Sequence, residues 1–205
     1  MKRSILLLTI VTLLFSACKD DDNETLLKSA RIIRSYKIAN QPVGELVNYS
    51  AAVGTVTVFV EPGADVSAVK PNITVSDQAT ITPASGETVD LSNGKTVKYT
   101  VKAQSGLEMD WEVTALTYEE PEIKTFTVNG IENNVVFQLP NIITVNYQAG
   151  SDITAVAPVI GLSQHATVAP ASGTAVNFQE NSTQTYTVTH PTGQQKTYVV
   201  KFVAQ

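Results

Sequence analysis

The feature that most constrains this chain is an internal repeat. Shifting the 205-residue sequence by 87 residues places residues 55–115 over residues 142–202, with about 22 identities in 61 pairs and no gap, far above chance. Nearer the N-terminus the offset slips to 90, which pairs Tyr36 with Phe126 and Ile38 with Val128. The chain therefore contains one small fold twice, and each copy must bury its own core.

The repeat also predicts the domain boundaries. Repeat 1 covers residues 28–117 and repeat 2 covers residues 122–205, with a linker at residues 118–121 that reads YEEP. A linker this short that ends in proline is stiff. We therefore expect two domains held end to end.

Within each repeat the hydrophobic pattern has a period of two. In residues 56–60 and again in 109–115, apolar residues alternate with others, which is typical of strands with one buried face. Turn signals such as Pro62-Gly63 separate these stretches, and Asn93-Gly94 favours a two-residue hairpin turn. No helical stripe of useful length follows residue 27. Short strands separated by turns predict an all-β protein built of antiparallel sandwiches.

The N-terminus has the layout of a signal peptide at residues 1–17. A positive start precedes the apolar run ILLLTIVTLLF, which is shorter than the roughly 20 residues that a membrane span needs. Cys18 follows small residues and resembles the lipobox cysteine of bacterial lipoproteins, so we expect it to be acylated and to attach the chain to a membrane. The alternatives are an ordinary secreted protein or an uncleaved anchor.

Residues 18–27 would then form an acidic tether. Its start, Lys19-Asp20-Asp21-Asp22, resembles the surface-export signal of Bacteroidota lipoproteins. By that resemblance the protein is expected in the outer membrane, lipid-anchored and facing the cell exterior.

Composition excludes several other functions. The net charge is −5, which is unusual for a nucleic-acid-binding protein. One cysteine permits no disulfide within the chain, and two histidines leave a zinc site almost without ligands. We expect no cofactor.

Polar residues that recur in both repeats have structural explanations. Asp65 and Asp152 are either calcium ligands or turn caps, and we expect caps because no other acid recurs with them. Ser85 and Ser172 have no evident base. His165 and His190 occur only in repeat 2, where we expect ordinary polar positions. These absences predict that the protein is not an enzyme.

Aromatic residues divide into matched and unmatched positions. The matched residues are expected in the core, Trp111 and Tyr198 among them. Five unmatched residues are better surface candidates, although Tyr147 replaces a buried valine: Tyr49, Phe59, Tyr118, Phe137 and Tyr147. Because aromatics stack on sugars and anchor protein partners, we regard Tyr49, Tyr118 and Phe137 as candidate ligand contacts.

The repeated motifs support a family resemblance. G-x-D-[VI]-[ST]-A-V-x-P-x-I, then A-T-[IV]-x-P-A-S-G, then Y-T-V, occur in both copies. They resemble the tandem immunoglobulin-like repeats of Bacteroidota surface lipoproteins, many of them classed as DUF5018-like or as cell-adhesion proteins. The resemblance covers nearly the whole mature chain. It implies two tandem immunoglobulin-like antiparallel β-sandwich domains, and implies function only in outline.

Three functions remain open. The first is a surface binding or adhesion module for a glycan, a host protein or a neighbouring surface protein. The second is a structural spacer or assembly subunit of an outer-membrane complex, and the third and least favoured is an enzyme. Since the two repeats share no polar cluster, we expect any site where they differ. These places are the first loop (39–53 against 129–140), the linker around Tyr118, and the turns at 92–95 and 179–182.

Overall fold

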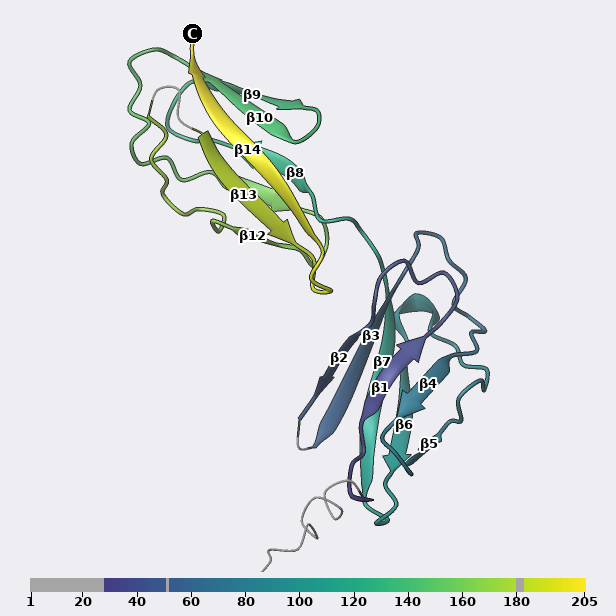
Figure 1. Ribbon diagram of the computed structural model, residues 1–205. Helices are drawn as coiled ribbons and strands as arrows, with labels where there is room; N and C mark the ends of the chain where they lie inside the picture. Colours follow the sequence, from purple (N-terminus) through teal and green to yellow (C-terminus); the bar gives the residue numbers. More distant parts are fainter. Residues whose placement is uncertain (1–27, 51, 180–182) are drawn as a thin grey trace, which may run out of the picture.

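The computed structural model describes residues 28–50, 52–179 and 183–205, and it shows two β-sandwich units in tandem (Figure 1). Among the described residues, one 3-10 turn accompanies strands β1 to β14. This confirms the predicted all-β fold of tandem immunoglobulin-like domains. In the described part of the chain, no helix is long and apolar enough to cross a membrane.

Repeat 1 pairs a two-stranded sheet with a five-stranded sheet. The small sheet joins β1 to β4, and the large sheet has the order β2-β3-β7-β6-β5. The elements are β1 (Ile33–Lys37), β2 (Leu46–Tyr49), β3 (Val53–Val60), β4 (Asn72–Val75), β5 (Thr80–Thr82), η1 (Ser92–Gly94), β6 (Thr96–Lys102) and β7 (Glu108–Thr117).

Repeat 2 reproduces this topology strand for strand. Its small sheet joins β11 to β8, and its large sheet has the order β12-β13-β14-β10-β9. The elements are β8 (Ile123–Thr127), β9 (Asn133–Gln138), β10 (Ile142–Tyr147), β11 (Val159–Leu162), β12 (Thr167–Ala169), β13 (Thr183–Thr189) and β14 (Gln195–Ala204).

One strand pair in each large sheet differs from the expectation of a purely antiparallel sandwich. β3 runs parallel to β7, with Val56 opposite Val113, and β10 runs parallel to β14. A parallel pair needs a long connection, which the chain between Val60 and Glu108 supplies. A period of two shows which face of a strand is buried, but it does not show the direction of the neighbouring strand.

The turn at Asn93-Gly94 also differs from its prediction. Both residues have positive φ, 55° and 69°, as their types suggested. They lie in η1, which leads into β6, rather than between two paired strands of a hairpin.

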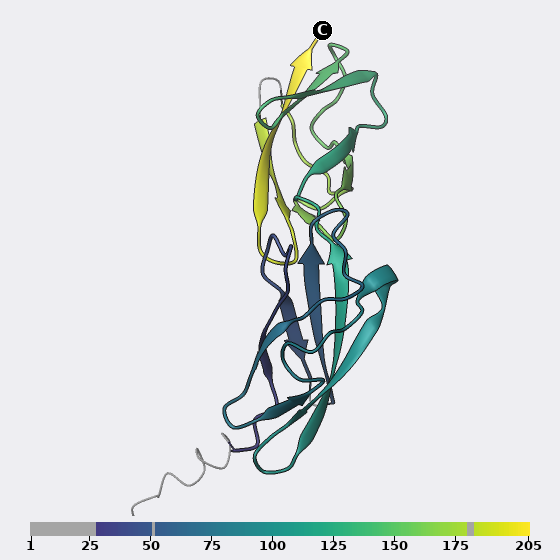
Figure 2. The ribbon, with the colours of Figure 1, turned by 90° about the vertical axis from the view of Figure 1, so that its right-hand side faces the viewer.

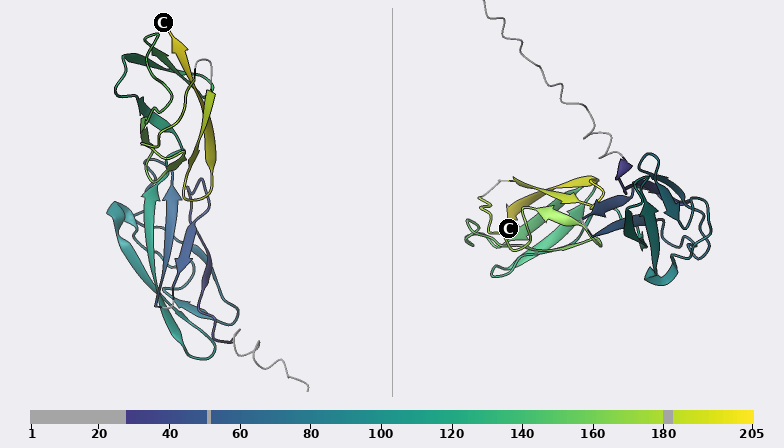
Figure 3. Two further views of the ribbon diagram at one scale, coloured as in Figure 1. Left: turned by 90° about the vertical axis from the view of Figure 1, so that its left-hand side faces the viewer. Right: turned by 90° about the horizontal axis from the view of Figure 1, so that it is seen from below.

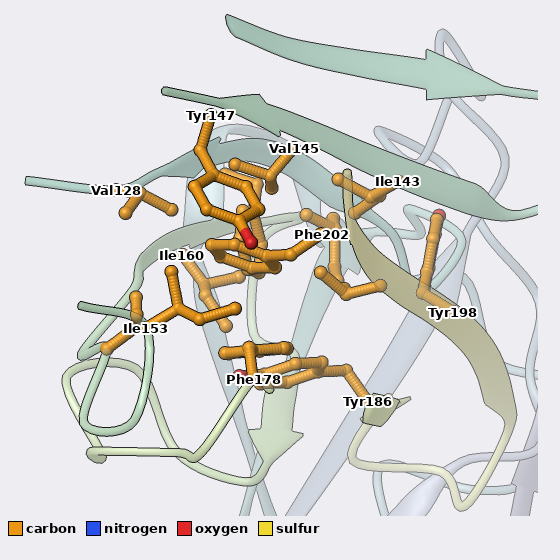
Figure 4. Close-up of a cluster of buried hydrophobic side chains, with 14 of the residues drawn as sticks. Val128, Ile143, Val145, Tyr147, Ile153, Ile160, Phe178, Tyr186, Tyr198 and Phe202 are labelled. Atoms are coloured by element: carbon orange, nitrogen blue, oxygen red, sulfur yellow. The ribbon is translucent and has the colours of Figure 1, made fainter. Parts of the chain in front are cut away.

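Each repeat has a separate hydrophobic core, and the two cores correspond in detail. The edge-to-face pair of Tyr36 and Tyr99 in repeat 1 has ring centroids 5.7 Å apart. Phe126 and Tyr186 form the same pair at 5.7 Å in repeat 2. Figure 4 shows the repeat 2 core, with Tyr147, Phe178, Tyr186 and Phe202 among its rings. The 90-residue offset near the N-terminus is thereby confirmed.

The predicted inward positions of Trp111 and Tyr198 are confirmed as well. Trp111 is fully buried and Tyr198 is 6% exposed. The Trp111 Nε1 donates a hydrogen bond to the carbonyl of Arg31 at 3.0 Å, which ties β7 to the residues that precede β1.

The two repeats lie end to end along one axis (Figures 2 and 3). The described chain begins at one end of this axis, and Gln205 lies at the other. Each repeat therefore has a distal end, which we define as the end nearer to Gln205. The distal end of repeat 1 meets repeat 2.

Candidate functional site

The duplicated aspartates are turn caps, as predicted. One Asp65 carboxylate oxygen accepts hydrogen bonds from the Ser67 backbone N–H at 2.9 Å and from its hydroxyl at 2.7 Å. Asp152 does the same with Thr154. The hydroxyl and the backbone amide of Ser67 hold the pKa of Asp65 below its usual range. Among the described residues, no three side chains of His, Cys, Asp or Glu gather as a metal site.

The duplicated serines have a structural role too. The Ser85 hydroxyl oxygen accepts a hydrogen bond from the backbone N–H of Ile73 at 2.9 Å, and Ser172 accepts one from Ile160 at the same distance. Each serine thus fastens the PASG turn to the start of the small sheet. These shared polar residues build the framework.

The aromatic residues that meet where the repeats join form a contact that we call the joint. Phe59 of repeat 1 lies against His190 of repeat 2, with ring centroids 4.5 Å apart, and Tyr118 lies 5.2 Å from the same imidazole. Phe59 and His190 are each 1% exposed. The expectation that Phe59 faces the surface is therefore wrong, because repeat 2 covers it. His190, expected at an ordinary polar position, is buried in the joint.

Polar contacts add to the joint. The Tyr118 hydroxyl donates a hydrogen bond to the Gln194 side chain. The Glu119 carboxylate accepts one from the Gln164 backbone N–H at 2.6 Å and forms an ion pair with Lys124 at 2.9 Å. Linker residues thereby contact repeat 2 at several points, which agrees with the stiffness predicted from its length.

The His190 imidazole is held in its neutral form. Burial, and then the charge of the neighbouring His165, lower the pKa of His190. Its Nδ1 is 2.7 Å from the Thr192 hydroxyl, and its Nε2 has no hydrogen-bond partner among the described residues. A buried imidazole in an aromatic contact serves packing between the repeats.

Tyr118, a candidate ligand contact, lines a groove beside the joint. The groove holds about 430 Å³, and its lining includes the acids Glu61, Glu119 and Glu120. Burial, followed by the charges of Glu120 and Glu61, raises the pKa of Tyr118. The Tyr118 hydroxyl and ring both contact repeat 2 in the joint, so the main role of this side chain is structural.

Phe137, the second candidate, lies in a separate place that we call the Phe137 groove. This groove holds about 220 Å³ and is formed by the β9–β10 turn, the start of β8 and the start of β14. Phe137 is 46% exposed and Leu139 is 96% exposed. Gln138 and Asn141 add amide groups, and the Lys196 ammonium pairs with Glu122 at 2.7 Å. An exposed ring beside amides suits stacking on a sugar face.

The structure does not bring the three aromatic candidates together. Tyr118 and Phe137 line different grooves. The backbone of Tyr49 pairs with Gly54, and its side chain lies outside the described residues. Cys18 and the segment Lys19-Asp20-Asp21-Asp22 also lie outside them, as does part of the turn at 179–182.

Sequence reasoning missed the roles of Phe59 and His190, although one signal pointed to them. The counterpart of Phe59 in the other repeat is Asn146, and the counterpart of His190 is Ala103. Repeat 1 meets the joint with its distal end, and repeat 2 meets it with the other end. A residue in the joint therefore has a counterpart that lies outside the joint, and the two need not match. Unmatched residues at one end of each repeat therefore mark the contact between them.

Comparison with known proteins places both halves in one family. A family model described as SGBP, N-terminal, matches residues 33–115 and again residues 123–202. The DUF5018-like label suggested by the sequence motifs is not confirmed by this match. No curated protein matches the chain.

Two solved structures from Bacteroides are similar to parts of the chain. A candidate glycoside hydrolase of Bacteroides thetaiotaomicron is 32% identical over 42% of this chain, with a TM-score of 0.39. The chain spans 25% of that protein. A candidate secreted protein of Bacteroides fragilis is 16% identical, over 45% of this chain and 98% of its own length, with a TM-score of 0.34.

Proposed function

We propose, from the finding that the chain belongs to the family described as SGBP, N-terminal, that it is a non-catalytic protein that binds glycans at the cell surface. The observation that carries this proposal is the double match, which covers residues 33–115 of repeat 1 and residues 123–202 of repeat 2. Glycan binding is the role that this family suggests. It is also one of the ligand classes that the sequence left open.

The non-catalytic part of the proposal rests on how the polar residues are used. Ser85 and Ser172 each accept a hydrogen bond from a backbone amide, and His190 is buried in the joint. Incubation with bound polysaccharide should therefore release no shorter products. Chromatography of the polysaccharide before and after incubation checks this, and cleavage would contradict it.

We place the ligand contact in repeat 2, with Phe137 as a stacking ring. The test is a glycan array probed with the full-length chain in a detergent without a sugar headgroup. Phe137→Ala should weaken binding by about twofold to tenfold, since one aromatic contact contributes about 0.5–1.5 kcal/mol. Leu107→Ala is the matched control, because Leu107 is a similarly exposed apolar residue of repeat 1. Equal losses in both variants would contradict this placement.

Attachment to the outer membrane through Cys18 belongs to the same proposal. Cys18→Ala should abolish acylation and membrane retention. Replacement of Lys19, Asp20, Asp21 and Asp22 by alanine should keep the anchor but make the protein inaccessible to proteases added to intact cells. Normal membrane retention of the first variant would contradict the lipid anchor at Cys18. Unchanged protease access in the second variant would contradict the surface-export signal.

The joint favours a second candidate function, a structural spacer in a surface complex. Phe59, Tyr118 and His190 hold the repeats end to end, as a spacer requires. No binding to any polysaccharide on the array would favour this function over glycan capture.

A further inference from the structure

The distal ends of the two repeats are built alike. In repeat 1 the Tyr118 backbone N–H donates to the Val60 carbonyl at 2.7 Å. In repeat 2 the Gln205 N–H donates to the Tyr147 carbonyl at 2.9 Å. These pairs correspond at the 87-residue offset. The distal end of repeat 2 therefore has the same backbone hydrogen bond as the distal end of repeat 1, which forms the joint.

The side chains at the two distal ends differ in kind. Phe59 and Tyr118, which pack on repeat 2, correspond to Asn146 and Gln205. The acidic Glu61 corresponds to Gln148. The aromatic contacts of a joint are absent from these positions of repeat 2, and uncharged amides stand in their place. This end is therefore chemically unsuited to pack another domain in the same way.

The amides surround a cavity that we call the distal pocket. It holds about 320 Å³ and is lined by five asparagine and glutamine residues, one glutamate and Tyr147. Its volume lies at the lower end of the range of about 300–1,000 Å³ that small-molecule sites occupy. The lining residues, apart from the ring of Tyr147, are Glu132, Asn133, Asn134, Asn146, Gln148 and Gln205.

The frame of the pocket is fixed, whereas several of its amides are available. The Asn133 side chain donates to the carbonyls of Val128 and Ile131, each at 2.9 Å. Tyr147, 5% exposed, packs in the core against Phe202 (Figure 4). Asn134 and Asn146 are opposite each other in the β9–β10 register, and their side chains form no hydrogen bond with the described residues.

The chemistry of the lining selects the ligand class. A carboxamide offers donors and an acceptor together, which matches hydroxyl groups that both donate and accept. The lining contains no lysine or arginine, so it has no cation to attract a sulfate or a uronic acid. Glu132 disfavours an anion further.

We propose that the distal pocket of repeat 2 binds a neutral sugar through its hydroxyl groups. This inference rests on the proposed glycan-binding function; it adds to the Phe137 groove a second contact, at the other end of β9, and it names the ligand class. Gln205, which lines the pocket, lies at the opposite end of the molecule from the start of the described chain (Figure 2). A chain anchored near its N-terminus would thus present the pocket on the far side from the anchor.

The test uses the full-length chain in a detergent without a sugar headgroup. Maltohexaose, cellohexaose and mannohexaose serve as neutral probes, and hexagalacturonate is the charged comparison. Dissociation constants are measured by calorimetry for wild type, Asn146→Ala, Gln148→Ala, Phe137→Ala and the control Asn48→Ala, an exposed asparagine of repeat 1. Thermal melting confirms that each variant is folded.

The expected result is binding of at least one neutral probe, with Asn146→Ala and Gln148→Ala each weaker by about fivefold to tenfold, as for one lost hydrogen bond. Asn48→Ala should bind like wild type. If wild type binds and neither amide variant is weaker, whether or not Phe137→Ala is weaker, the distal pocket is wrong while glycan binding stands. Binding of hexagalacturonate alone would overturn the neutral class. Failure of wild type to bind any probe or any polysaccharide on the array would overturn the proposed function itself.

Discussion

Repeat 1 and repeat 2 use the same strand order and the same caps, yet their distal ends have opposite characters. The distal end of repeat 1 carries Phe59 and Tyr118 and is covered by repeat 2. The distal end of repeat 2 carries Asn146 and Gln205, which line the distal pocket together with other asparagine and glutamine residues. The comparison teaches that residues shared by the repeats maintain the framework. The unmatched residues determine what each end contacts.

The cores sharpen the comparison, because each repeat fills the same space differently. Trp111 lies opposite Gly54 in the parallel register, and an added Cβ at Gly54 would lie 2.4 Å from the indole ring. In repeat 2 the same positions hold Tyr198 and Asn141. A smaller ring thus accompanies a larger neighbour, and we expect the two substitutions to compensate each other.

The largest expected effect is the loss of the core ring. Trp111→Ala should lower the free energy of unfolding of repeat 1 by about 3–5 kcal/mol, because the ring is fully buried and its Nε1 holds the Arg31 carbonyl. Tyr198→Ala should destabilise repeat 2, near the low end of that range, since Tyr198 keeps 6% exposure. Denaturant unfolding with a probe in each repeat measures both. Losses below about 1 kcal/mol in both variants would mean that these rings are not core.

A smaller effect is expected at the glycine that faces Trp111. Gly54→Ala should cost about 1–3 kcal/mol, the usual range for overpacking, since the new Cβ would overlap the indole ring. Asn141→Ala, the matched change in repeat 2, should change the free energy of unfolding by less than about 1 kcal/mol. Equal costs at the two positions would break the proposed compensation between ring and neighbour.

The paired aromatics make the next prediction. The hydroxyls of Tyr36 and Tyr99 share a hydrogen bond of 3.0 Å. In repeat 2, Phe126 replaces the first tyrosine, and the buried Tyr186 hydroxyl has no partner among the described residues. Burial raises the pKa of Tyr186 to about 12.

Exchanging phenylalanine and tyrosine at positions 36 and 126 should remove the hydroxyl pair from repeat 1 and create one in repeat 2. Tyr36→Phe should destabilise repeat 1 by about 1–2 kcal/mol, because it leaves the Tyr99 hydroxyl buried and unpaired. Phe126→Tyr should stabilise repeat 2 by about 0.5–1.5 kcal/mol, because it supplies a partner for Tyr186. Thermal unfolding of the two single variants checks both signs. A loss of stability in Phe126→Tyr would show that repeat 2 has no room for the second hydroxyl.

The smallest expected effect is a pH dependence of the joint. The pKa of His190 is lowered by burial and by His165, so the packed joint favours the neutral imidazole. The stability that the neutral imidazole gives to the joint is fully present above the unperturbed pKa of about 6.5. It is lost as the pH falls through the lowered value, where proton binding favours separation of the repeats. Phe59, Tyr118, His165 and Thr192 are the groups that face or contact this ring.

Spin labels at Lys98→Cys and Thr197→Cys, with Cys18→Ser, can report the geometry of the joint. The distance distribution between them should be narrow at pH 7.5 and broader at pH 5. His190→Phe, which keeps a ring but cannot titrate, should remove most of the change. The same broadening in His190→Phe would assign the pH dependence to another group.

The sequence alone predicted the parts of this account that depend on one repeat at a time. The period of two and the 87-residue offset gave the strands, the core positions of Trp111 and Tyr198, and the caps at Asp65 and Asp152. It did not predict the parallel pairing of β3 with β7, because alternation is the same in either direction. It also missed the burial of Phe59 and His190, since such burial depends on how one repeat lies on the other.

The distal pocket was beyond sequence reasoning for a different reason. Asn134 and Asn146 lie twelve residues apart in the chain and meet only because β9 and β10 pair in one register. The Gln205 contact with Tyr147 depends in addition on the parallel pairing of β14 with β10. No motif records that arrangement.

The central claim is that the shared framework is structural and that ligand contacts fall on the unmatched residues of repeat 2. Hydrogen exchange of the full-length chain, with and without a neutral hexasaccharide that it binds, tests this claim most directly. Protection should increase in peptides from residues 132–148 and at the C-terminal end of β14, with no change in the matching residues 42–61 of repeat 1. Equal protection in both segments, or protection confined to repeat 1, would contradict the claim.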